Sequence, residues 1–156
     1  MGTDLEKAQN SANMWAITAL SMTIGIWDMV EDSATSLSPM IGEQILVMAE
    51  QMFQLKLAGE GPEKIMIDLG RIFVNEFGLC GAVSVEMKDN AVVTLLKDSI
   101  GINEMKALQA RGITKFFAHP FLCAGLAALA RTGIKTRANL EIGANNKDTT
   151  ITFEYI

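Results

Sequence analysis

The sequence predicts a mixed α+β fold in which an antiparallel sheet of two hairpins is backed by helices, in the order αααββααββ. Three observations predict it. Apolar residues recur with a helical period as far as Gly78, the period changes to two from Ala82, and a second alternating pair of segments follows Ile134. A chain of 156 residues is long enough to bury one core without disulfide or metal support.

The first predicted helix runs from about Asp4 to Val30, with apolar side chains spread around most of its circumference. Such a helix needs partners on several sides. One face of a domain covers only part of that surface, so we expect a homodimer in which residues 1–37 contribute to the contact. Membrane insertion is disfavoured because the apolar stretch is short, contains Thr18 and Asp28, and follows acidic residues.

A polar break precedes the second predicted helix, which runs from Pro39 to about Leu57 with Ser38 as its N-terminal cap. Gly59-Glu60-Gly61 then interrupts the chain, and a third helix runs from Pro62 to Gly78. The second helix is expected to bury one stripe of large apolar side chains: Ile41, Ile45, Met48, Met52 and Leu55.

The rest of the sequence predicts a hairpin, two helices and a second hairpin. Residues 82–97 predict a hairpin, residues 102–111 a short helix, and residues 113–131 an apolar helix that is interrupted or begun at Pro120. Residues 134–155 predict a second hairpin with one buried and one exposed face. Residues 38–156 are therefore expected to form one domain behind the N-terminal helix.

Composition narrows the class of function. Hydrophobic residues make up 49% of the chain and ten are Met, so apolar surface is expected between subunits or around a ligand. A net charge of −5 without a basic cluster disfavours direct binding of nucleic acid. Neither Cys80 nor Cys123 belongs to a CxxC pair, so we expect reduced, buried thiols and a cytoplasmic protein.

His119 and Cys123 are the two residues to consider as a catalytic pair, because they lie one helical turn apart. The local sequence offers no carboxylate to orient the histidine, so a capping or core role is the stronger expectation for His119. The spacing of His119, Cys80 and Cys123 matches no known zinc site. We therefore expect no catalytic residue, no metal and no cofactor.

Five short segments, in this order, resemble the 4-vinyl-reductase-type domain, a hydrocarbon-binding family related in fold to the small TRAPP vesicle-tethering subunits. They are Met40–Glu43, Glu76–Leu79, Leu96–Ser99, Pro120–Gly125 and Thr152–Ile156. The resemblance covers residues 38–156 and implies a dimer with a pocket among its helices for a small apolar molecule. Many members hold zinc with cysteines in the final hairpin, where this chain has Gly143-Ala144 and Ile151.

The resemblance predicts a dimeric sensory or carrier module that binds a small apolar ligand and is not itself an enzyme. An apolar pocket with a few polar groups is typical of such sites, and His119 is a candidate for the orienting hydrogen bond. Two alternatives stay open: a tethering adaptor without ligand, and an accessory factor to a tetrapyrrole vinyl reductase. The residues expected to line the pocket are Met48, Met52, Phe116, Phe117, His119, Phe121 and Cys123.

Overall fold

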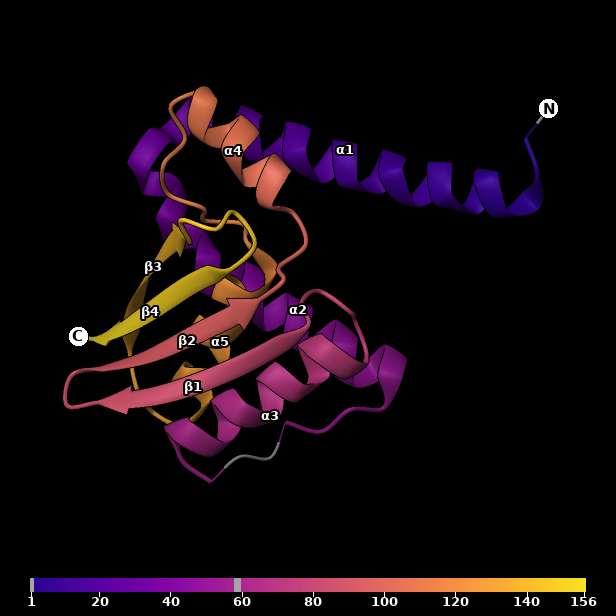
Figure 1. Cartoon of the computed structure of the whole chain (residues 1–156). Helices are drawn as coiled ribbons and strands as arrows, with labels where there is room; N and C mark the ends of the chain where they lie inside the picture. The colour runs from indigo at the N-terminus through magenta and orange to yellow at the C-terminus, as the bar shows by residue number, and fades with distance from the viewer. Residues whose placement is uncertain (1, 58–59) are drawn as a thin grey trace.

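The computed structural model describes residues 2–57 and 60–156 and has the predicted mixed α+β architecture (Figure 1). A short 3-10 helix, η1, adds to the predicted order. The elements are α1 (Asp4–Val30), η1 (Glu31–Leu37), α2 (Ser38–Phe53), α3 (Pro62–Asn75), β1 (Ala82–Lys88), β2 (Ala91–Lys97), α4 (Ile102–Ala110), α5 (Pro120–Arg131), β3 (Thr136–Ile142) and β4 (Thr149–Tyr155). The predicted break at Gly59 lies outside the described residues.

The two predicted hairpins join into one four-stranded antiparallel sheet with the order β1-β2-β4-β3. Strands β2 and β4 connect the hairpins, and Val92 lies opposite Phe153 across this pair. The alternation seen in the sequence buries Phe153 and Ile151 completely, while their neighbours on β4 stay partly exposed. One face of the sheet therefore carries the core, and α3 and α5 pack against it.

Helix α5 forms the centre of the molecule, because residues 121–129 are all buried. Its small residues allow its neighbours to approach closely. A Cβ on Gly42 of α2 would overlap the Cys123 carbonyl oxygen, and a Cβ on Gly125 would overlap the Phe153 ring. Arg131 at the end of α5 also binds Glu43 and Glu50 of α2, with the closest contact to each at 2.8 and 2.7 Å.

The structure corrects two predictions about α2. Ser38 is the first residue of the helix and not its cap, since its hydroxyl donates to the Phe117 carbonyl at 2.7 Å and Leu37 holds the cap position. The buried face consists of Ser38, Gly42, Leu46 and Ala49, whereas Met48 and Met52 are 56% and 69% exposed. Gly42 allows this face to approach α5 closely, since a Cβ there would overlap the Cys123 carbonyl oxygen.

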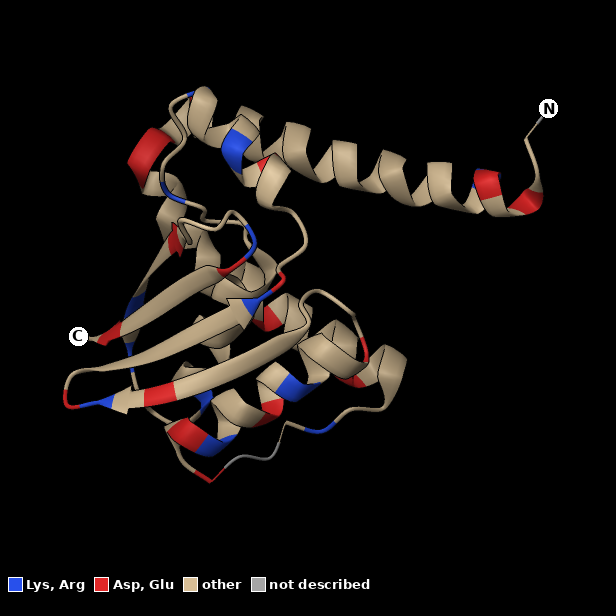
Figure 2. Ribbon diagram, in the orientation of Figure 1, with Lys and Arg blue, Asp and Glu red and all other residues tan. Residues whose placement is uncertain are grey.

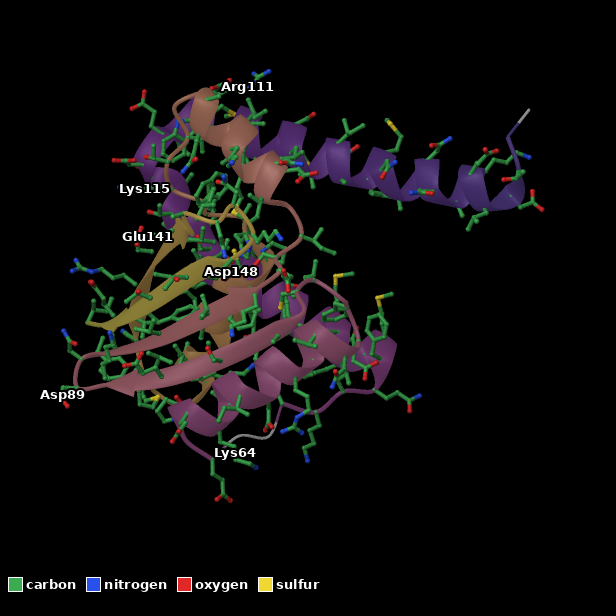
Figure 3. All side chains as sticks on the ribbon, viewed as in Figure 1. Lys64, Asp89, Arg111, Lys115, Glu141 and Asp148 are labelled. Atoms are coloured by element: carbon green, nitrogen blue, oxygen red, sulfur yellow. The ribbon has the colours of Figure 1, made fainter. Side chains whose placement is uncertain are left out.

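Helix α1 projects past the rest of the molecule at its N-terminal end (Figure 1). Thr23 is its one buried residue, and the helix is nearly free of charge between its two ends (Figure 2). No helix in the described part of the chain is long and apolar enough to cross a membrane. The labelled charged side chains, such as Lys64, Asp89 and Arg111, project outward from the other elements (Figure 3). Part of the apolar surface of α1, including Trp15 and Met22, is thus left uncovered within one chain.

Candidate functional site

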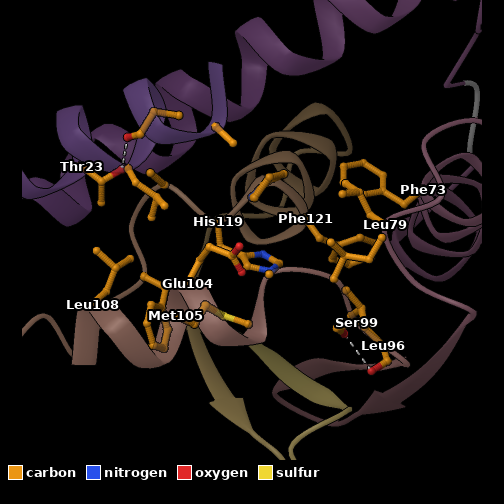
Figure 4. Close-up of a pocket in the computed structure, with 18 residues that line it drawn as sticks. Thr23, Phe73, Leu79, Leu96, Ser99, Glu104, Met105, Leu108, His119 and Phe121 are labelled. Carbon is orange, nitrogen blue, oxygen red and sulfur yellow. Dashed lines mark hydrogen bonds between the residues drawn. The ribbon is translucent and has the colours of Figure 1, made fainter. Parts of the chain in front are cut away.

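An apolar cavity of about 320 Å³ lies between the C-terminal half of α1, the short helix α4 and the start of α5 (Figure 4). Residues from the end of α3 and the end of β2 complete its wall. Its volume lies within the range of small-molecule sites, roughly 300–1,000 Å³. An apolar cavity of about 150 Å³ can hold one benzene, so this one can hold a molecule of about twice that size.

The cavity has an apolar floor and a partly exposed mouth. The floor residues are buried and come from four elements and the loop before α5: Phe73, Leu96, Met105, Leu108, Phe116 and Phe121. Phe121 is completely buried and meets Phe73 edge to face, with ring centroids 5.0 Å apart. Ala16 and Ala19 of α1 and Ile100 after β2 are exposed at the mouth. The cavity is therefore open beside α1, and buried aromatic and aliphatic side chains close its inner end.

His119 is a polar side chain that its capping role holds in this wall. It is the N-cap of α5, and its Nδ1 accepts a hydrogen bond from the Leu122 N–H at 3.3 Å. A neutral imidazole that accepts at Nδ1 carries its proton on Nε2. Burial lowers the pKa of His119 to about 4, so the ring is neutral at physiological pH. The ring lies among the lining side chains in Figure 4.

The Nε2–H group of His119 has no hydrogen-bond partner among the described residues. This nitrogen is nevertheless not fully enclosed by the protein. Among the described residues, Thr136 Oγ1 is the one fully buried side-chain nitrogen or oxygen that lacks a hydrogen-bond partner, so an unpaired Nε2 must be partly accessible. The two hydroxyl groups of the lining differ from it, because Thr23 donates to the Ala19 carbonyl at 2.9 Å and Ser99 pairs with Thr149 at 2.9 Å. His119 therefore supplies the free side-chain donor of the cavity.

The structure brings together three of the seven residues predicted to line the pocket. Phe116, His119 and Phe121 form part of the cavity wall. Phe117 is buried outside it and stacks on Trp27 of α1, with ring centroids 6.5 Å apart. Cys123 is also buried away from the cavity, and Met48 and Met52 lie on the exposed face of α2, so these four do not line it.

The two thiols are held in unreactive surroundings. Burial raises the pKa of Cys123 to about 12 and also raises the pKa of Cys80. The Cys123 Sγ–H donates to the Phe117 carbonyl at 3.0 Å and makes no bond with His119. Because the thiolate is the nucleophilic form of cysteine, neither residue is activated for attack. No group of three or more His, Cys, Asp or Glu in the described residues is placed to hold a metal ion.

Sequence reasoning missed the part of the cavity that α1 and α4 supply. The signal was present, since the α1 residues recur every three or four positions on one face. In a helix that is apolar on all sides, however, periodicity does not distinguish this face from the others. The missed lining residues with side chains from these helices are Ala16, Ala19, Leu20, Thr23, Glu104, Met105 and Leu108.

A second cavity of about 320 Å³ lies on the other side of Phe116, which lines both. Its wall is more polar than that of the first cavity and includes Lys115, Arg137 and Asn139 from the loop before α5 and from β3. Thr136, whose hydroxyl is buried without a partner, also belongs to this wall. Water satisfies such groups, so this second space suits solvent better than an apolar molecule.

Comparison with known proteins identifies the fold. No family model and no curated protein matches the chain. Among solved structures, a trafficking protein particle complex subunit 3 from Naegleria fowleri, covalently bound to palmitic acid, matches with a TM-score of 0.58 and 11% identity over 95% of this chain and 96% of that chain. An H-NOX protein mutant from K. algicida matches with a TM-score of 0.46 and 13% identity, over 78% of this chain and 63% of that one. The chain thus has a TRAPP-like fold, whereas its assignment to the 4-vinyl-reductase type is not supported.

Proposed function

We propose that the protein binds a small apolar molecule in the cavity between α1, α4 and α5. The observation that carries this proposal is the cavity itself, whose floor is aromatic and aliphatic and whose polar groups are few. The trafficking subunit from Naegleria fowleri, which has a similar fold, is covalently bound to palmitic acid, a molecule with a long apolar chain. A cavity left empty forfeits dispersion contacts along its whole lining, so a matching apolar molecule restores them.

We further propose that the protein has no catalytic activity of its own. Both cysteines have raised pKa values, and the neutral His119 already uses Nδ1 to cap α5. General base catalysis by His119 would require a free ring nitrogen that can accept a proton. A carrier or sensor function agrees with this chemistry, since both require binding and no reaction.

The dimer that a sensory or carrier module would form is proposed to use the outer face of α1. Trp15, Met22 and Met29 recur every seven residues along this face and are 75%, 61% and 83% exposed. Small residues, Thr18 and Gly25, lie between them. A seven-residue repeat of this kind is what two packed helices require.

An antiparallel arrangement of two α1 helices matches large side chains to small ones. With the two-fold axis beside residue 20, Trp15 of one copy faces Gly25 of the other, and Met22 faces Thr18. The flank of Gly25 is open, since a Cβ there would meet nothing within 4 Å. A parallel pair would instead place the acidic Asp4 and Glu6 beside their own copies, which like charges disfavour.

Titration with N-phenyl-1-naphthylamine, an uncharged probe that fluoresces in apolar surroundings, tests the ligand proposal. The purified protein is expected to bind one probe per chain, and the variant Ala19→Trp, which fills the mouth from α1, is expected to bind it at least tenfold more weakly. Ala12→Trp is the matched control, because Ala12 is an exposed alanine two turns earlier on α1 and lies outside the cavity lining. Equal binding by both variants would contradict the proposal.

The adaptor alternative draws on the same exposed face of α1 and needs no ligand. Sedimentation separates the possibilities when combined with the titration. A dimer that binds no probe would favour the adaptor, and a monomer of 16.9 kDa that binds the probe would remove the dimer from the proposal while keeping its site. The accessory role with a vinyl reductase depends on the 4-vinyl-reductase resemblance alone, so we do not argue it further.

A further inference from the structure

We infer that the cavity selects an uncharged apolar molecule carrying a hydrogen-bond acceptor, such as a ketone or an ester, and discriminates against carboxylates. This inference rests on the proposed function and specifies the chemical class of its ligand. Three observations support it: the unpaired Nε2–H of His119, the hydrogen bonds that Thr23 and Ser99 already make within the protein, and the lack of a positively charged side chain among the described lining residues.

The need for an acceptor follows from His119. Its Nε2–H group lies in the cavity wall without a partner among residues 2–57 and 60–156, while Thr23 and Ser99 are already bonded within the protein. An apolar ligand that displaced water from this group would leave a donor unsatisfied, and that is costly. A carbonyl or ether oxygen on the ligand would accept the bond and remove the cost. A pure hydrocarbon therefore fits the floor of the cavity but binds more weakly, because it leaves the His119 donor unsatisfied.

The exclusion of carboxylates follows from the absence of positive charge. No lysine or arginine is among the described residues that line this cavity, and the one charged lining residue is Glu104 at the mouth. Taking a carboxylate out of water without a cationic partner is strongly unfavourable. The negative charge of Glu104 adds repulsion, and the low pKa of His119 keeps the imidazole from becoming the missing cation.

The start of α5 offers few free backbone N–H groups to an anion. Helix N-termini bind anions through free backbone N–H groups. Here Pro120 has no N–H, the Leu122 N–H donates to the His119 ring, and the Cys123 N–H donates to the His119 carbonyl at 3.0 Å. His119 therefore occupies two of the three backbone N–H groups of this turn, those of Leu122 and Cys123, so a carboxylate would find the Phe121 N–H alone.

Three compounds of similar size, 2-acetylnaphthalene, 2-ethylnaphthalene and 2-naphthoate, separate these effects when each displaces N-phenyl-1-naphthylamine at pH 8. We expect the ketone and the ethyl compound to bind and 2-naphthoate to bind at least tenfold more weakly than the ketone. In His119→Asn, which retains a capping acceptor for α5, the affinity ratio of ketone to ethyl compound is expected to fall about threefold to tenfold, the usual worth of one hydrogen bond.

The outcomes distinguish this inference from the proposed function. If the ethyl compound binds and its ratio to the ketone is the same in wild type and His119→Asn, the acceptor requirement is wrong while the apolar site stands. Naphthoate binding as tightly as the ketone would overturn the discrimination against carboxylates. If none of the three compounds binds, the proposed function fails and this inference fails with it. His119→Ser, which also retains a capping oxygen, serves for the comparison if the Asn variant does not fold.

Discussion

Helices α5 and α1 are both rich in apolar residues, yet the chain buries one and exposes the other. In α5 the residues 121–129 are all buried, whereas Thr23 alone is buried in the 27 residues of α1. The difference lies in side-chain size and in available partners. Small residues let α2 and β4 approach α5 closely, while no described element covers the outer face of α1, which carries Trp15 and Met22.

Apolar composition alone therefore does not determine whether a helix is buried. The inner face of α1 completes the ligand cavity through Ala16, Ala19 and Leu20, and its outer face is free to contact a second copy. Helix α5 supplies the other wall through His119 and Phe121. The cavity thus lies between α5, which is almost completely buried, and α1, which is mostly exposed.

The largest expected effect on folding comes from Phe121 of α5. Replacing it with Ala removes a completely buried ring, and such changes cost about 3–5 kcal/mol. Leu5→Ala in α1 is the control, since Leu5 is 77% exposed and should change the free energy of unfolding by less than about 0.5 kcal/mol. Urea unfolding measures both. A loss below about 1 kcal/mol for Phe121→Ala would show that this part of α5 is not tightly packed.

Two glycine substitutions are expected to have opposite signs. Gly42→Ala would place a Cβ against a backbone oxygen of α5, so α2 and α5 must separate at a cost of about 1–3 kcal/mol or more. Gly25→Ala in α1 meets open space and improves helix propensity by up to about 1 kcal/mol. Thermal unfolding of the two variants gives both signs. The same sign for both would contradict the packing difference between the helices.

His119 is expected to make stability depend on pH. Its pKa is about 4 in the folded chain and 6.5 when unperturbed, so above pH 6.5 the ring is neutral in both states and contributes nothing to the pH dependence. As the pH falls from about 6.5 to 4, the unfolded chain takes up a proton that the folded chain refuses, and about 2–3 kcal/mol of stability is lost.

The control for this pH dependence is His119→Asn, because the chain contains one histidine. The difference in unfolding free energy between wild type and variant should shrink or reverse across this range and then level off below about pH 4. A difference that is constant with pH would mean that the imidazole is not held neutral by burial.

The smallest effect on folding is expected from the outer face of α1. Trp15→Glu and Met22→Glu should weaken self-association strongly, because each places a charge in the proposed helix pair, yet change the unfolding of the separated chain by less than about 0.5 kcal/mol. Leu5→Glu is the control, since Leu5 is exposed on α1 outside the stripe. Sedimentation equilibrium shows the result. Dimers that persist in both variants would place the contact elsewhere.

The sequence predicted the order of elements and both hairpins because alternation and turn residues are local signals. It also indicated Pro120 as a boundary, which the start of α5 confirms. The buried face of α2 was predicted only in part, since Ile41 and Ile45 pack against the core whereas Met48 and Met52 are exposed. Periodicity counts large apolar residues such as Met48, whereas the packing depended on Gly42 and on a contact with Cys123 that is distant in sequence.

The candidate site was predictable only in part for the same reason. Phe116, His119 and Phe121 cluster near one another in the sequence and lie together in the cavity. The remaining wall comes from α1, α3, the end of β2 and α4, which are brought together by packing that no local pattern indicates. The role of His119 as cap and donor also required the position of the Leu122 N–H, which only the structure supplies.

Crystals soaked with 2-bromonaphthalene would show whether an apolar molecule binds between α1 and α5, because the anomalous signal of bromine locates the ligand without assumptions about its site. We expect one strong bromine peak per chain between these helices, in contact with Phe121 and Leu108. No peak in this cavity, or peaks only along the outer face of α1 or in the polar cavity beside Thr136, would contradict it.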